Sequence, residues 1–162
     1  MNRALAVASL LVLATFGCGP REQKITLDGT AFTIRRPVQA DKVPNPVEIV
    51  KAAGAIPEDG ATKGHTAFDG SWYASGRFPS SPENESVGAS TGIIVRSFPS
   101  RKELEEALAN NQDAVGDDSN TVLIGKGKPF YVVITGMLGE NGVIFDIDLN
   151  QVAALINAEV RP

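Results

Sequence analysis

The chain is poor in the residues that build common catalytic and metal sites. Its 162 residues include one cysteine, one histidine and one tryptophan. A single cysteine forms no internal disulfide, and any His-based metal site or Ser-His-Asp triad would depend on His65 alone. No Gly-x-Ser-x-Gly nucleophile elbow is expected either: residues 88–92, Gly-Ala-Ser-Thr-Gly, have that spacing, but a predicted strand follows them where the motif requires a helix. The sequence therefore offers no recognisable catalytic constellation, and we expect neither a metal ion nor another cofactor.

Basic residues are outnumbered and scattered. Fifteen Lys and Arg residues against 19 Asp and Glu residues give a formal net charge of −4, which becomes −5 if residues 1–17, with one arginine and no acid, are removed. Nucleic-acid binding requires basic residues clustered on one surface. The densest basic pairs, Arg35-Arg36 and Arg101-Lys102, are too short for such a patch. We expect no nucleic-acid partner.

The one long apolar run stands at the N-terminus and predicts a signal peptide. Residues 4–16 are almost entirely apolar, follow Arg3 and end at Gly17-Cys18. A membrane-spanning helix needs about 20 apolar residues, so this run is too short to span a bilayer. A short apolar core between a positive start and small residues is typical of an exported protein. We expect residues 1–17 to be removed.

Residues 13–18, Leu-Ala-Thr-Phe-Gly-Cys, resemble the lipobox of bacterial lipoproteins, in which a small residue precedes a cysteine at the end of the apolar run. The resemblance implies cleavage before Cys18 and acylation of its sulfur with palmitate-type chains. Each buried methylene contributes about 0.8 kcal/mol, so two or three chains anchor a protein almost irreversibly. We expect a lipid anchor in the cell membrane or outer membrane, on the extracytoplasmic face. Ordinary secretion, which would leave Cys18 a free thiol, is the alternative.

Residues 18–45 predict a lipidated tether, a short hairpin and a proline-rich linker. Residues 24–35 alternate around Asp28-Gly29, a dipeptide typical of hairpin turns. Residues 37–46 contain three prolines and lead into the main domain. The sequence leaves open whether the hairpin packs on that domain or holds it off the membrane.

Residues 46–162 predict a single α+β domain. Capping patterns predict three helices, which begin after Asn45, at the Ser100 and Glu103 capping box, and after Asp148. Periodicity predicts strands at residues 68–78, 92–98, 121–125, 130–135 and 143–147. The order αββαββ(β)α favours an antiparallel sheet of about four to five strands with the helices packed on one face.

Apolar positions indicate which residues face the core. Residues 130–135 are apolar on both faces, which predicts a central strand. The final helix is expected to turn Val152, Leu155, Ile156 and Val160 inward.

Four residues are candidates for a binding site. Trp72 and Phe78 share the inward face of their strand, which leaves Tyr73 exposed. Asp146 and Asp148 fall on one face of the last predicted strand, where paired carboxylates could serve acid-base chemistry, although a solvated face and a helix cap explain both. His65 is expected on a surface loop.

Residues 50–55, Val-Lys-Ala-Ala-Gly-Ala, and residues 68–78, Phe-Asp-Gly-x-Trp-Tyr-Ala-Ser-Gly-x-Phe, resemble small secreted lipoproteins of actinobacteria-like bacteria. That group has no assigned function. The likeness extends to residues 132–136 and the closing helix, and it supports the lipoprotein interpretation while supplying no catalytic residue.

Two functions fit these observations. The first is a lipid-anchored binding or accessory module of the cell envelope, monomeric, attached to the membrane through Cys18 and engaging an envelope protein. The alternative is a small extracytoplasmic hydrolase that uses Asp146 and Asp148 or His65. The missing catalytic constellation favours the first, non-enzymatic function.

Overall fold

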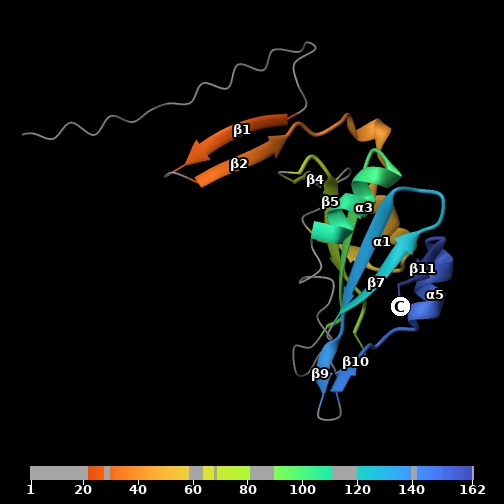
Figure 1. Cartoon of the computed structure of the whole chain (residues 1–162). Helices are drawn as coiled ribbons and strands as arrows, with labels where there is room; N and C mark the ends of the chain where they lie inside the picture. The colour runs from red at the N-terminus through yellow and green to blue at the C-terminus, as the bar shows by residue number, and fades with distance from the viewer. Residues whose placement is uncertain are drawn as a thin grey trace, which may run out of the picture.

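The computed structural model describes residues 22–27, 30–58, 64–67, 69–80, 90–110, 120–139 and 142–161 (Figure 1). Within these ranges it contains helices α1 (Pro46–Ala52), α3 (Arg101–Asn110) and α5 (Leu149–Leu155), and a 3-10 turn η1 (Ala40–Lys42). None of the helices in the described ranges is long and apolar enough to cross a membrane. The expected α+β class with a mainly antiparallel sheet is confirmed.

The sheet has seven strands in the order β11-β7-β8-β6-β5-β3, and β4 also pairs with β5. Every pairing in it is antiparallel. The strands are β3 (Ile56–Pro57), β4 (His65–Thr66), β5 (Trp72–Arg77), β6 (Gly92–Ser97), β7 (Asn120–Gly125), β8 (Phe130–Thr135) and β11 (Ala158–Val160). The prediction of four to five strands missed β3, β4 and β11, because two or three residues are too few to show a period of two.

The helix starts predicted from capping residues are confirmed. Asn45 Oδ1 accepts the backbone N–H of Val47 at 3.0 Å and Asp148 Oδ1 accepts that of Asn150 at 2.9 Å. Ser100 Oγ accepts the N–H of Glu103 at 3.3 Å. Each side chain satisfies an N–H group that the first turn of a helix leaves without a partner.

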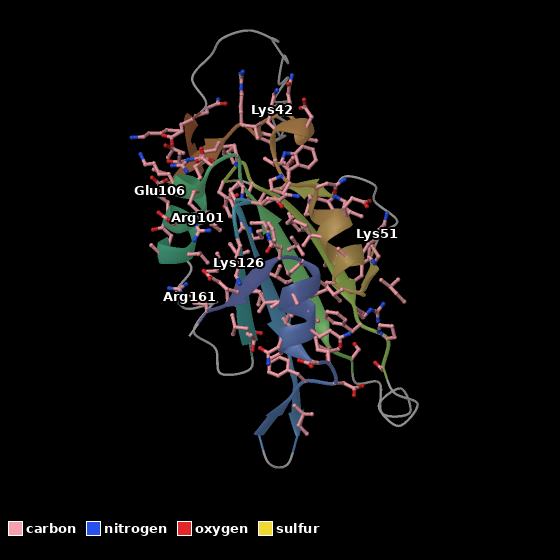
Figure 2. All side chains as sticks on the ribbon, turned by 90° about the vertical axis from the view of Figure 1, so that its right-hand side faces the viewer. Lys42, Lys51, Arg101, Glu106, Lys126 and Arg161 are labelled. Carbon is pink, nitrogen blue, oxygen red and sulfur yellow. The ribbon has the colours of Figure 1, made fainter. Side chains whose placement is uncertain are left out.

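The larger core lies between the sheet and the pair of helices α1 and α5. Val47 and Val50 of α1 and Val152 of α5 are buried against alternate residues of the strands, among them Val132, which is fully buried. Figure 2 shows α1 and α5 over the same face of the sheet. Burying a valine or isoleucine contributes about 1.5–3 kcal/mol, so this layer is a main source of stability.

Helix α3 lies on the opposite face, so the prediction that all helices pack on one face is wrong (Figure 1). Leu104, Ala107 and Leu108 of α3 pack with Phe98, Val122 and Tyr131 to form a second, smaller core. The reason lies in β8, which is central as predicted and has buried residues on both faces. A strand with two apolar faces needs cover on both.

The C-terminal segment also differs from its prediction. Helix α5 ends at Leu155, and Asn157, with a φ of 51°, turns the chain into edge strand β11. Leu155 is therefore 56% exposed and Val160 40% exposed, whereas Val152 and Ile156 are buried as expected. Asparagine tolerates the left-handed backbone region better than most residues, which favours the turn at this position.

Two hairpins stand outside the seven-stranded sheet. β1 (Glu22–Leu27) pairs with β2 (Thr30–Arg35), which confirms the N-terminal hairpin, while the Asp28-Gly29 turn lies outside the described residues. β9 (Met137–Gly139) pairs with β10 (Gly142–Ile144) at the opposite end of the molecule (Figure 1).

The proline-rich linker packs against the domain. Trp72 Nε1 donates a hydrogen bond to the carbonyl of Val38 at 3.0 Å, and Val43 is buried. The hairpin itself extends away from the sheet (Figure 1). The linker therefore joins the hairpin to the domain as a packed segment.

Gly76 tests the packing of α1 on the sheet. A Cβ atom at Gly76 would lie 2.6 Å from Val50 Cγ1 and 2.8 Å from the carbonyl oxygen of Ile56. We expect Gly76→Ala to lower the free energy of unfolding by about 1–3 kcal/mol, because the core has no room for the added methyl group. Urea denaturation measures the change. Gly92→Ala is the matched control, since a Cβ there meets nothing within 4 Å; equal effects at the two sites would contradict the packing argument.

Candidate functional site

A row of cross-strand neighbours positions the central side chain of the candidate site. Tyr73 of β5 is the Cα partner of Arg96 of β6, which is in turn the partner of Tyr131 of β8. Direct partners project from the same face of a sheet. This is the face of the sheet on which α3 packs. Arg96 lies at the edge of the small core that α3 forms with Phe98 and Tyr131.

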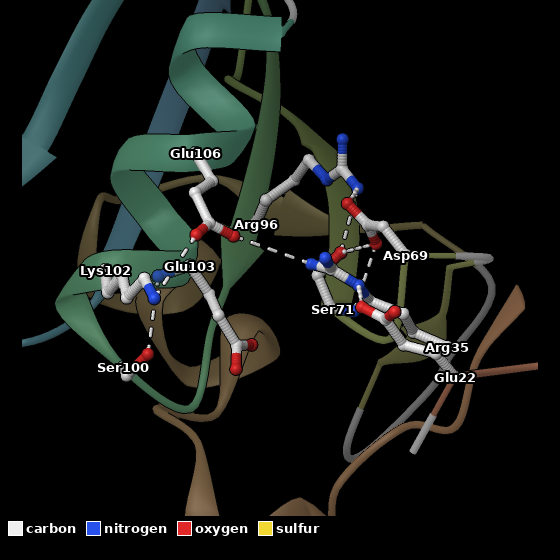
Figure 3. A network of polar contacts seen from close by, with 9 residues as sticks. All are labelled: Glu22, Arg35, Asp69, Ser71, Arg96, Ser100, Lys102, Glu103 and Glu106. Atoms are coloured by element: carbon white, nitrogen blue, oxygen red, sulfur yellow. Dashed lines mark hydrogen bonds and ion pairs between the residues drawn. The ribbon is translucent and has the colours of Figure 1, made fainter. Parts of the chain in front are cut away.

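Arg96 forms a polar network with the turn before β5 (Figure 3). Its Nη2 donates to Asp69 Oδ2 at 2.5 Å and to Ser71 Oγ at 2.8 Å. The Ser71 hydroxyl donates to Asp69 Oδ1 at 2.6 Å, and the Ser71 backbone N–H donates to the same oxygen at 3.0 Å. Each of these groups is thus held by at least two contacts, and charge-assisted bonds of this kind are among the stronger ones.

Aromatic rings hold the guanidinium of Arg96 from the side of the small core. Its Cζ lies 5.9 Å from the centroid of the Phe98 ring and 6.0 Å from that of Tyr131. Its Nη1 donates to the Tyr131 hydroxyl at 3.3 Å. The two rings stack with their centroids 5.7 Å apart. Cations at such distances from aromatic faces are attracted by the ring quadrupole, so the arginine is fixed in position.

The network changes the acidity of two of its members. Burial alone would raise the pKa of Asp69, but the hydrogen bonds from Ser71 and the positive charge of Arg96 together hold it below its usual value. Burial raises the pKa of the Tyr131 hydroxyl, and this effect exceeds the opposing effect of Arg96. At neutral pH the network therefore contains an ionised aspartate and a protonated tyrosine.

A groove of about 360 Å³ opens above this network. Its floor includes Asp69, Arg96 and Phe98, and one wall is the α3 face with Glu103 and Glu106. Ala67, Ala107, Asn110 and Arg35 complete the lining. The groove is at the lower end of the size range of small-molecule sites and carries charges of both signs.

Arg35 joins the hairpin to the groove. Its Nε contacts Glu22 Oε1 of β1 at 2.8 Å and its Nη1 lies 3.7 Å from Glu106 Oε2 of α3 (Figure 3). A Cβ at Gly70, which has a φ of +79°, would lie 3.2 Å from the Arg35 Cβ. Exposed ion pairs contribute about 0–1 kcal/mol each, so their role here is to place the end of β2 against the groove.

Of the predicted candidates, Tyr73 belongs to the row that holds Arg96, but neither it nor His65, Asp146 or Asp148 lines the groove. His65 and Tyr73 are cross-strand partners whose ring centroids are 5.6 Å apart, and both are exposed. The expectation that His65 lies on a loop is wrong, because it forms the short strand β4 by pairing with β5. Strand β10 ends at Ile144, so the prediction of Asp146 and Asp148 on a strand face is wrong. Asp146 lies in a bend and Asp148 caps α5. Cys18 lies outside the described residues.

Within the described ranges, no three His, Cys, Asp or Glu residues come together in a group that could hold a metal ion. The carboxylates of the groove are instead interleaved with arginines. Sequence reasoning missed Asp69 and Arg96, although Arg96 is the one charged residue in segment 92–98. A lone charge in a strand next to aromatic residues is the signal that could have found it.

Comparison of the chain with models of known protein families, with curated proteins and with solved structures finds no match.

The pKa of Asp69 gives a prediction for stability. A carboxylate whose pKa is lowered in the folded state stabilises that state above its usual pKa of 3.8 and loses this effect as the pH falls through the lowered value. Asp69→Asn should therefore lower the urea midpoint at pH 7, and the difference from the wild type should shrink as the pH falls below 3.8. The control is Asp41→Asn, which removes a carboxylate that is 70% exposed. A difference between Asp69→Asn and wild type that is independent of pH would count against the ion pair.

Proposed function

We propose that this protein is a lipid-anchored binding or accessory module of the cell envelope, held by acyl chains on Cys18 at the extracytoplasmic face of the membrane. The lipobox-like residues 13–18 support the anchor. The groove over Arg96 and Asp69 supports binding, and it is the observation that carries the proposal. Its partner is a polar segment of an envelope protein.

The floor of the groove is suited to binding because its charged groups are held in place before a partner arrives. Arg96 is fixed by Asp69, Ser71 and two aromatic rings, and its side chain is 21% exposed. A group already ordered by its own neighbours loses little conformational entropy when it binds. The lining presents acceptors from three carboxylates and donors from two arginines, which fits a partner that offers polar groups of both kinds.

The same groups are poorly suited to catalysis. The lowered pKa of Asp69 makes its carboxylate a weak base at neutral pH, whereas a general base works best with a pKa near the operating pH. Ser71, the hydroxyl beside it, is 1% exposed and is closed to a substrate. Asp148 is engaged in capping α5. These observations favour a binding role over the hydrolase alternative.

The lipid anchor is tested by the intact mass of protein extracted from membranes. We expect the wild type to have the mass of residues 18–162 plus acyl chains and to partition into the membrane fraction. Cys18→Ala should lose both properties, because the thiol that accepts the lipid is gone. An uncut or unacylated wild-type mass would overturn the anchor.

The groove is tested by filling it at its rim. Asn110 lines the groove at the end of α3, and Ala109 beside it is exposed and outside the lining. After chemical cross-linking of intact cells and mass spectrometry, a partner captured by wild type should be lost with Asn110→Trp and kept with Ala109→Trp. Loss of the partner in both variants, or in neither, would place the binding surface elsewhere.

A further inference from the structure

The register of the N-terminal hairpin separates its residues into two unlike faces. Six cross-strand pairs alternate along the hairpin. One set consists of Gln23 with Ile34, Ile25 with Phe32, and Leu27 with Thr30. The other set consists of Glu22 with Arg35, Lys24 with Thr33, and Thr26 with Ala31. Direct partners, and residues two apart in one strand, share a face. The first set, here called the apolar face, contains all four large apolar residues of the hairpin; the second set is the polar face.

Neither strand of the hairpin pairs with a strand of the seven-stranded sheet. Gln23 on the apolar face is exposed, as are Lys24, Thr26 and Thr33 on the polar face. Arg35, at the base of the polar face, reaches back to Glu106 of α3. The polar face thus contacts the body at the base of the hairpin through Arg35, and the apolar face is by register the opposite face. Ile34, at the base of the apolar face, is partly buried.

The chain between the anchor and the hairpin is short. Cys18 and Glu22 are four residues apart, and an extended chain spans at most about 3.3–3.6 Å per residue, or about 14 Å here. An acylated Cys18 lies at the bilayer surface, so β1 begins within that distance of it. Each strand is six residues, or about 20 Å, long. The hairpin is therefore the first folded element that meets the membrane.

The hairpin segment and the rest of the mature chain also differ in net charge. Residues 19–36 contain four basic and two acidic residues, whereas residues 37–162 contain ten basic and seventeen acidic residues. Anionic lipid surfaces attract nearby basic residues with about 1 kcal/mol each and repel acidic ones. An anionic bilayer would therefore attract the positive hairpin segment and repel the negative body.

We propose that the apolar face of the β1–β2 hairpin lies on the lipid bilayer and fixes the orientation of the domain above it. This inference rests on the proposed function, since lipid on Cys18 brings the hairpin to the membrane. Because Arg35 belongs both to the hairpin and to the lining of the groove, the groove is held close to the bilayer surface and takes its partner there.

The test uses the single native cysteine, which is consumed by acylation and leaves an introduced cysteine as the only free thiol. Lipidated Phe32→Cys and Thr33→Cys, labelled with an environment-sensitive fluorophore, are placed in vesicles of phosphatidylglycerol and phosphatidylethanolamine. These adjacent positions are on opposite faces by register. The label at position 32 should shift to the blue and be quenched by a nitroxide on the lipid chains, and the label at position 33 should be quenched by aqueous iodide.

The outcomes separate this inference from the anchor itself. Acylated protein that sediments with vesicles while both labels are quenched by iodide would overturn the membrane-facing hairpin and leave the anchor intact. A label at position 32 that is shielded from iodide but not quenched by the lipid nitroxide would replace the bilayer with a protein partner or a second copy. An unacylated mass would overturn both proposals. Trp72 fluorescence, which reports the packed linker, must match wild type in each variant.

Discussion

The architecture depends on strand β8, which must be covered on both faces. Phe130, Val132 and Ile134 point to the larger core, and Tyr131 points to the smaller one. A strand of this kind is stable only between two apolar layers, so one helix had to lie on the side opposite to the other two. Helix α3 meets this requirement with Leu104, Ala107 and Leu108, and the second layer it builds is small.

The candidate site forms because α3 covers only part of its face of the sheet. Helix α3 covers β7 and β8 but leaves Ile94 of β6 44% exposed and Tyr73 of β5 36% exposed. Arg96 lies at the boundary, with the Tyr131 and Phe98 rings on one side and Asp69 on the other. Its long side chain can pack its methylene groups against the core while the guanidinium stays at the polar edge. The groove is the space above this boundary, between α3 and the turn that carries Asp69.

The site is also linked to the N-terminal segment. The packed linker joins the hairpin to the domain through Trp72 and Val43, and Arg35 contacts residues of both β1 and α3. An orientation imposed on the hairpin is thereby passed to the groove, because the segment between them is held by contacts at both ends. A flexible tether would leave the groove free to point in any direction.

Local patterns in the sequence determined the starts of all three described helices, the central place of β8 and the pairing of residues 24–35 as a hairpin, because capping and periodicity act between neighbours in the chain. Only the tertiary structure decided that α3 lies on the second face, that β11 closes one edge, and that Asp69, Arg96 and Glu106 line one groove. Asp69 and Arg96 are 27 residues apart and Arg35 is 71 residues from Glu106. No local pattern brings such residues together, because their meeting depends on how strands and helices pack. The same limit explains why Asp146 and Asp148 were grouped by an alternation that β10 does not continue.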